Sequence, residues 1–211
     1  MEEQAIRIRP ILFSAQMVRA LLAGTKTQTR RPVKSRKDPE FGCEMAPGEI
    51  AGDQNPGRLC PYGQPGDRLW VRETFMDMLG TGVEHRHDPR GLLQRYAYAA
   101  DHQPGSYGDE ARKSYGLKWK PSIHMPRAAS RITLEITSVR VERLQNISES
   151  DAQAEGCALE CMTPTGDDNG SAIYGLGGYL ALWESINGAG SWNMNPWVWV
   201  VEFKRVEGCA A

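Results

Sequence analysis

The sequence lacks any apolar run near the about 18 residues of a membrane-spanning helix. Its first residues, Met-Glu-Glu-Gln, have neither the basic nor the apolar region of a secretory signal peptide, so we expect a cytoplasmic protein without membrane contacts. The cysteines number five and have irregular spacing, and Cys157 and Cys161 lack a matching second pair. This pattern argues against a disulfide framework and against a zinc site. P-loop, GxGxxG and Gly-x-Ser-x-Gly motifs are missing as well, and we expect neither a metal nor a cofactor.

The chain also has almost no net charge, at −1, but its charges are unevenly distributed. Residues 1–37 contain nine basic and two acidic side chains. A basic segment in a near-neutral chain indicates a local anionic partner such as a phosphate, although a solvated charged face explains the composition equally well. The low total charge favours a mononucleotide or a single flipped base over a long nucleic-acid footprint.

Hydrophobic periodicity predicts short strands and helices without a βαβ rhythm. We expect a strand that Pro10 ends and helices that begin at Ser14 and Ser148. The predicted strands cover 6–9, 69–73, 95–100, 132–142 and 197–203, and the predicted helices cover 14–23, 148–156 and 179–186. Residues 25–31 are interpreted as a strand or extended loop. The fold class is therefore α+β or mostly β, with a small, mostly antiparallel barrel and helices at its mouth.

The segment from Gly24 to Arg31 is the richest in chemistry, with one lysine, three threonines and two arginines. A partly buried Lys26 loses affinity for its proton and can act as a base, and Thr29 can then attack a carbonyl or position a water. Strict strand alternation separates these two side chains, whereas a turn or bulge near Gln28 lets them converge. Glu155, before Gly156, is the candidate third group. An ordinary polar edge strand and a solvated helix residue are the simpler interpretations.

A second candidate stretch follows Gly66 and combines aromatic and charged residues, of which Trp70, Arg72 and Glu73 are candidates for binding a nucleoside or nucleic acid. Strand alternation places Trp70 and Arg72 on one face and Glu73 on the other. Trp70 can stack on a base and Arg72 can hold an anion, or Trp70 belongs to the core and Arg72 pairs with an acid. Trp119 lies in a predicted loop and is a further candidate for ligand contact, whereas Trp183 is interpreted as a helix anchor.

Taken in order, these stretches make the chain resemble the ASCH-domain family of the PUA-like superfamily, most closely its phage and prophage members. More distantly, it resembles the bacterial N4-acetylcytidine amidohydrolases. The stretches that carry the resemblance span most of the chain: 21–31, 66–74, 121–127 with 130–132, 146–149 through 154–156, and 187–192 with 195–203.

The resemblance implies a compact β-barrel with helices flanking a cleft that binds RNA, nucleotides or modified bases. It also implies, by motif, that Lys26, Thr29 and Glu155 correspond to the catalytic lysine, threonine and glutamate of the amidohydrolases, and that Arg31 closes the lysine–threonine motif. The chain is about twice as long as those enzymes. We therefore expect one elaborated domain over residues 1–211 with insertions near 32–65 and 76–125, in the host cytoplasm if a phage encodes it.

Three functions remain open at this point. The first is a hydrolase of a C–N amide bond that removes an acyl group from N4-acylated cytidine or a related base. The second is a non-catalytic module for a nucleoside, a nucleotide, RNA or a modified base. In it Trp70 or Trp119 stacks on bases, and the phosphates are contacted by Arg30, Arg31, Lys34 and Arg36. The third is a phage accessory or assembly protein that uses its insertions for protein contacts.

Overall fold

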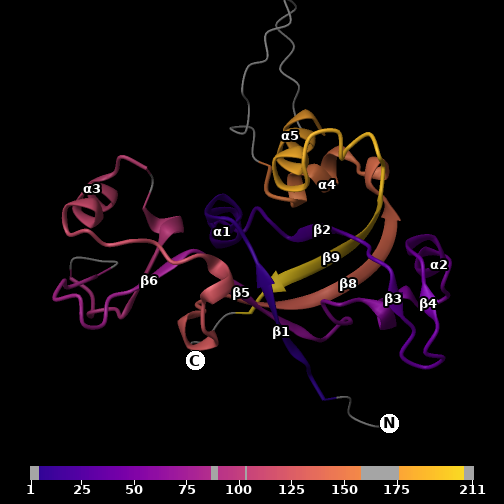
Figure 1. The fold of residues 1–211 in the computed structure, drawn as a ribbon, viewed down its shortest axis with the longest axis horizontal. Coiled ribbons are helices and arrows are strands. Elements are labelled where there is room, and N and C mark those ends of the chain that lie inside the picture. Colours follow the sequence, from indigo (N-terminus) through magenta and orange to yellow (C-terminus); the bar gives the residue numbers. More distant parts are fainter. Residues whose placement is uncertain (1–4, 87–89, 103, 158–175, 207–211) are drawn as a thin grey trace, which may run out of the picture.

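A five-stranded sheet organises the computed structural model, which describes residues 5–86, 90–102, 104–157 and 176–206. The strand order is β1-β5-β8-β9-β2, and β8 and β9 are the long curved strands in Figure 1. β1 pairs with β5 in parallel, and the other pairs are antiparallel. The strands are β1 (Ile8–Leu12), β2 (Gln28–Pro32), β5 (Arg68–Arg72), β8 (Thr133–Arg143) and β9 (Trp197–Arg205).

β9 lies inside the sheet and is buried on both faces, as its apolar sequence predicts. Trp199, Val201 and Phe203 enter the main core, which also includes residues of β1, β5 and the helix α1 (Ala15–Leu22). Val198 and Val200 enter a second core. That core includes residues of two further helices, α4 (Glu149–Ala154) and α5 (Leu176–Asn187), which lie together on one side of the sheet in Figure 1. The alternation of side chains along one strand thus separates two cores.

The expected class, a mixed α+β protein with a mostly β and mostly antiparallel sheet, is confirmed. The parallel β1–β5 pair is the departure from an all-antiparallel sheet. No strand pairing that would close the sheet into a barrel is detected in the part of the chain that the structure describes.

The prediction that Pro10 ends the first strand is wrong, because β1 runs through Pro10 to Leu12. Proline lacks the N–H that a central strand needs, but an edge strand can leave one side of its backbone unpaired. β1 is the edge strand next to β5, so Pro10 is tolerated there.

Local capping signals set the helices as predicted. Ser14 caps α1 by accepting a hydrogen bond from the Met17 N–H, and Ser148 caps α4 in a reciprocal capping box with Asp151. Gly156 follows α4 with a φ of +78°, a backbone conformation that strongly favours glycine. Gly188 follows α5 in the same way, with a φ of +97°.

Two segments leave the sheet, and Figure 1 shows them on opposite sides of it. The first contains β3 (Arg36–Lys37), β4 (Glu44–Met45) and α2 (Pro47–Ala51), and contributes Ile50 to the main core. The second contains β6 (Phe75–Asp77), β7 (Tyr96–Tyr98) and α3 (Tyr107–Ser114), and has two small apolar clusters of its own. These segments coincide with the stretches expected as insertions; that they are insertions into one domain stays a prediction.

The close approach at Gly156 gives a test of the packing between α1 and α4. A Cβ at this position would lie 2.7 Å from the Ala20 Cβ and 3.0 Å from the Lys26 Cβ, whereas a Cβ at Gly24, with a φ of +76°, would meet nothing within 4 Å. We predict that Gly24→Ala lowers the free energy of unfolding by about 1 kcal/mol through backbone strain alone. Gly156→Ala should cost about 1–3 kcal/mol more through overpacking. Urea denaturation of both variants checks this, and equal losses would contradict it.

Candidate functional site

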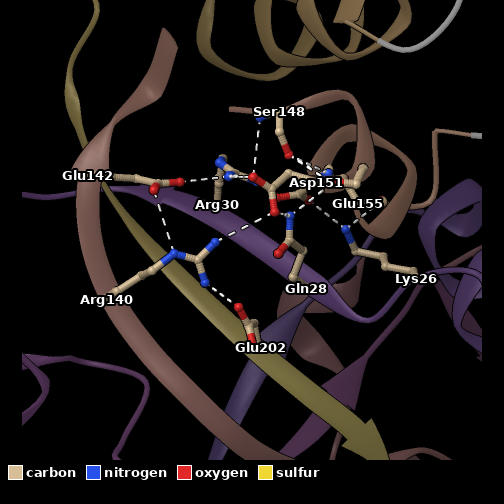
Figure 2. A network of polar contacts seen from close by, with 10 residues as sticks. Lys26, Gln28, Arg30, Arg140, Glu142, Ser148, Asp151, Glu155 and Glu202 are labelled. Atoms are coloured by element: carbon tan, nitrogen blue, oxygen red, sulfur yellow. Dashed lines mark hydrogen bonds and ion pairs between the residues drawn. The ribbon is translucent and has the colours of Figure 1, made fainter. Parts of the chain in front are cut away.

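Lys26 and Glu155 form a buried ion pair between segments 129 positions apart in the chain. The Lys26 Nζ donates to the Glu155 Oε2 at 2.8 Å and to the Glu155 backbone oxygen at 2.7 Å. The two residues also form an isolated antiparallel bridge through their backbones. The Lys26 side chain has no exposed surface and that of Glu155 is 3% exposed, so solvent does not screen the pair. Figure 2 shows how the chain before β2 approaches the end of α4.

Burial dominates the protonation of Lys26. Desolvation lowers the pKa of its amine from the usual 10.5, and the nearby charge of Arg31 acts in the same direction. The charge and hydrogen bond of Glu155 oppose this effect without cancelling it. The amine is therefore easier to deprotonate than a surface lysine, which is what a general base requires.

Arg30 lies at the centre of the network in Figure 2, between carboxylates of β8 and α4. Its Nη2 donates to the Glu142 Oε1 at 2.6 Å and lies 3.1 Å from the Asp151 Oδ2, and its Nη1 lies 3.5 Å from the Glu155 Oε1. The Arg30 side chain has no exposed surface. Its charge is thus engaged within the protein, where it helps to hold Glu155. The structure gives it no surface on which to meet a phosphate.

Asp151 links this network to the first turn of α4. Its burial raises the carboxyl pKa, but donors from Ser148 together with Arg30 and Gln28 outweigh this effect, and the net pKa is lowered. The Gln28 Nε2 donates to the Asp151 backbone oxygen at 2.9 Å and to its Oδ1 at 3.2 Å. Asp151 therefore stays ionised opposite Arg30 at neutral pH.

A cavity of about 40 Å³ adjoins this network between β2, α1 and α5. Its inner wall contains buried side chains, namely Thr29, Arg30, Glu155, Tyr179 and Trp183. Its remaining lining is half-buried or exposed and comprises Met17, Arg31, Pro32, Leu182, Ile186 and Asn187. The exposed Ile186 and Asn187 mark the side that opens toward solvent. The cavity therefore reaches from the surface near the end of α5 to Glu155.

Several buried polar atoms of this lining have no hydrogen-bond partner among the described residues. They are the Glu155 Oε1, the Trp183 Nε1, the Arg31 Nε, and the Nε and Nη1 of Arg30. Buried polar atoms are normally hydrogen-bonded, and a cavity of this size has room for a water or a small polar group. The lining is thus suited to a guest that presents both a hydrogen-bond donor and an acceptor.

The structure brings the three residues expected to carry catalysis to one place, together with the adjacent Arg30 and Arg31. Thr29 and Arg31 line the cavity with Glu155, and Lys26 lies behind Glu155 on its other oxygen. The convergence does not come from a bulge near Gln28, because β2 pairs with β9 in regular register. It arises because Lys26 precedes the strand. The catalytic roles of these residues stay predictions.

Trp70, Arg72 and Glu73 do not line this cavity. Arg72 lies over the Trp70 ring at 5.4 Å and donates to the Ile123 backbone oxygen. Glu73 is 1% exposed and pairs with Arg131 at 2.9 and 3.0 Å. Burial raises the Glu73 pKa despite this partner. Glu73 therefore belongs to an internal ion pair.

Trp119 also lies away from the cavity, in the segment that contains α3. Its ring is 5.9 Å from the His102 ring and 5.5 Å from the Arg112 guanidinium. The ligand-binding roles of Trp70, Arg72, Glu73 and Trp119 stay predictions, and the structure does not bring these residues to Lys26 and Glu155.

Trp183 is the functional candidate that the sequence did not identify. Its place on the apolar face of α5 indicates a helix anchor, and its side chain is indeed 3% exposed in the second core. A signal was available in principle, because a buried indole always brings an N–H that needs an acceptor.

Comparison of the chain with protein-family models, with curated proteins and with solved structures finds no match. Within the described residues, no group of three or more His, Cys, Asp or Glu could hold a metal ion. The same part of the chain contains no helix of the length and apolarity that crossing a membrane requires. Cys161 and Cys209 lie outside the described residues.

The ion pair gives a stability prediction. Lys26→Met removes one charge and leaves Glu155 poorly compensated, which should cost about 3–5 kcal/mol of unfolding free energy. Lys26→Met with Glu155→Gln removes both charges, and we predict that this double variant recovers most of that loss. Guanidinium denaturation measures both, with Lys34→Met, at an exposed lysine, as the control that stays within about 0.5 kcal/mol of the parent. A double variant as unstable as the single one would show that the pair itself stabilises the fold.

Proposed function

We propose that this chain is an ASCH-like protein that binds a nucleoside or modified base at the cavity beside Glu155 and removes an acyl group from its exocyclic amine. The substrate class is N4-acylated cytidine or a related base. The observation that carries the proposal is the buried pairing of Lys26 with Glu155, whose second oxygen accepts no hydrogen bond from the described residues, beside a cavity that Glu155 and Thr29 both line.

In this proposal each of the three residues has its own role. Neutral Lys26 accepts the Thr29 hydroxyl proton, and the Thr29 oxygen attacks the acyl carbonyl carbon. The tetrahedral intermediate collapses when the C–N bond breaks, and the leaving amine takes the proton back through Lys26 or Glu155. Water then hydrolyses the acyl-threonine ester with the same base and releases the carboxylic acid. General base catalysis of this kind contributes about 10²–10⁴-fold to the rate.

The size of the cavity decides which part of the substrate it receives. Pockets for a whole small-molecule ligand enclose about 300–1,000 Å³. The cavity here has about 40 Å³, which is far too small for a nucleoside and leaves room for the acyl group at most. In this proposal the base and ribose therefore lie at the open side, against Arg31, Pro32 and Asn187.

The proposal also concerns the fold: we propose that the five-stranded sheet is the larger part of a PUA-like barrel. The length and curvature of β8 and β9 support this, as does the register shift between Ile136 and Ser138, because bulges of this kind bend strands toward closure.

A non-catalytic module for RNA or a modified base is the second candidate. The hydrogen-bonded contact of Lys26 with Glu155 favours it, since that contact stabilises the charged amine and so opposes its use as a base. In this case the cavity recognises the modified amine without breaking it.

Release of acetate from N4-acetylcytidine separates the two candidates. We predict release by the parent protein and a loss of about 10²–10⁴-fold in kcat/KM for Thr29→Val and for Glu155→Gln. Thr27→Val is the matched control, because Thr27 belongs to the same segment but is exposed, and its kcat/KM should stay unchanged. Acetate is measured by a coupled assay or by NMR. Binding without release by the parent protein would support the non-catalytic module instead.

The pH profile tests the role of Lys26. Because burial lowers its amine pKa, the neutral base becomes available below pH 10.5, and kcat/KM should rise with pH to a plateau reached below that value. Lys26→Arg keeps the positive charge and cannot lose its proton, so we predict that it abolishes the pH-dependent rise together with the activity. A Lys26→Arg variant that keeps the activity of the parent protein would contradict base catalysis by Lys26.

A further inference from the structure

The indole N–H of Trp183 is a buried hydrogen-bond donor that has no acceptor among the described residues. The Trp183 side chain is 3% exposed, lines the cavity, and packs against Tyr179 with ring centroids 6.3 Å apart. An unpaired donor in the core destabilises the fold, and replacing it by an apolar ring would remove that cost. Its retention at a cavity points to an acceptor supplied by a ligand.

Glu155, which lines the same cavity, carries the complementary hydrogen-bond acceptor. Its Oε2 is occupied by Lys26, while its Oε1 accepts no hydrogen bond from the described residues. The cavity therefore offers a neutral donor from α5 and an anionic acceptor from the end of α4. A secondary amide carries the matching pair, a carbonyl oxygen and an N–H, whereas an alkylated amine carries only the N–H.

The other unpaired donors suit this task less well. The Arg30 guanidinium is surrounded by Glu142, Asp151 and Glu155, which already balance its charge. Arg31 donates to the Leu12 backbone oxygen and lies over a phenylalanine ring, which fixes its guanidinium. An indole forms no ion pair and only donates, so a neutral carbonyl oxygen is a fitting partner for Trp183.

We infer that Trp183 donates its Nε1–H to the carbonyl oxygen of the bound acyl amide and thereby distinguishes N-acyl from N-alkyl substrates. This inference rests on the proposed function and adds a specificity residue to it. The donor also polarises the carbonyl that Thr29 attacks, because negative charge develops on this oxygen in the tetrahedral intermediate.

The test compares two ligands in two proteins. N4-acetylcytidine and N4-ethylcytidine both carry a two-carbon substituent on an N–H. They differ in that only the acetyl group has a carbonyl oxygen. Binding is measured by calorimetry in a Thr29→Val background, so that the acyl group stays in place. We expect Trp183→Phe to weaken binding of the acetyl ligand about tenfold, the effect of one lost hydrogen bond, and to leave binding of the ethyl ligand unchanged.

Trp192→Phe is the matched control. Trp192 contacts the same Tyr179 ring at 6.2 Å but does not line the cavity, so its replacement should leave both affinities unchanged. Equal weakening of both ligands by Trp183→Phe would overturn the inference, since it would show a packing role, and the proposed function would stand. Failure of both ligands to bind the Trp183-containing protein would overturn the proposed function and the inference with it.

A second measurement does not depend on the stability of a Trp183 variant. The chain has six tryptophans, so its ¹⁵N-labelled form gives one indole N–H resonance for each. The Trp183 resonance is assigned in the Thr29→Val protein, which keeps the acyl group in place, from triple-resonance spectra and from NOEs to the neighbouring Tyr179 ring. We expect this proton to move downfield when N4-acetylcytidine binds and to stay in place with N4-ethylcytidine. A Trp183 resonance that is indifferent to the acetyl ligand would overturn the inference.

Discussion

The buried contact between Lys26 and Glu155 is the constraint on which the arrangement of the site depends. It is both a side-chain ion pair and a backbone bridge, and the neighbouring Thr27 N–H donates to the Ala154 backbone oxygen at 2.8 Å. These contacts fix the end of α4 against the chain that leaves α1 and enters β2. Gly156 permits the approach, because any side chain there would collide with Ala20 and Lys26. Thr29 lies three residues after Lys26, in the regularly paired strand β2. The contact between Lys26 and Glu155 therefore also sets the position of Thr29 relative to Glu155.

Such a contact is an expensive way to stabilise a fold. Two charges leave water, and well-packed apolar side chains of similar size would often stabilise the protein equally well or better. The cost grows with Arg30, which brings to the same place a third buried charge and two nitrogens without a hydrogen-bond partner among the described residues. A cluster of poorly satisfied polar groups beside a cavity is expected where function is favoured over stability, as in sites that are organised before their ligand arrives.

The sequence predicted the features that local interactions determine. Ser14 and Ser148 as caps, Gly156 as a stop, and the two buried faces of β9 depend on neighbouring residues and on side-chain periodicity. Pro10 shows the limit, because proline disrupts a central strand but not an edge strand, and edge position is a property of the assembled sheet. The parallel pairing of β1 with β5 is likewise non-local, since it depends on the path of about sixty residues between them.

The sequence indicated which residue types form the site, but not which residues contact one another there. From the residues alone Glu155 is most simply a solvated helix residue, and the resemblance to a family was needed to connect it with Lys26. Adjacent Arg30 and Arg31 show why. Alternation along β2 directs one guanidinium to the carboxylates of α4 and β8 and the other to Phe13 and the Leu12 backbone, so two identical side chains acquire different surroundings. The strand face that an arginine occupies, and the groups that lie on that face, decide whether it meets a ligand or an internal acid. Alternation along the strand predicts the face, but the groups on it are known only once the chain has folded.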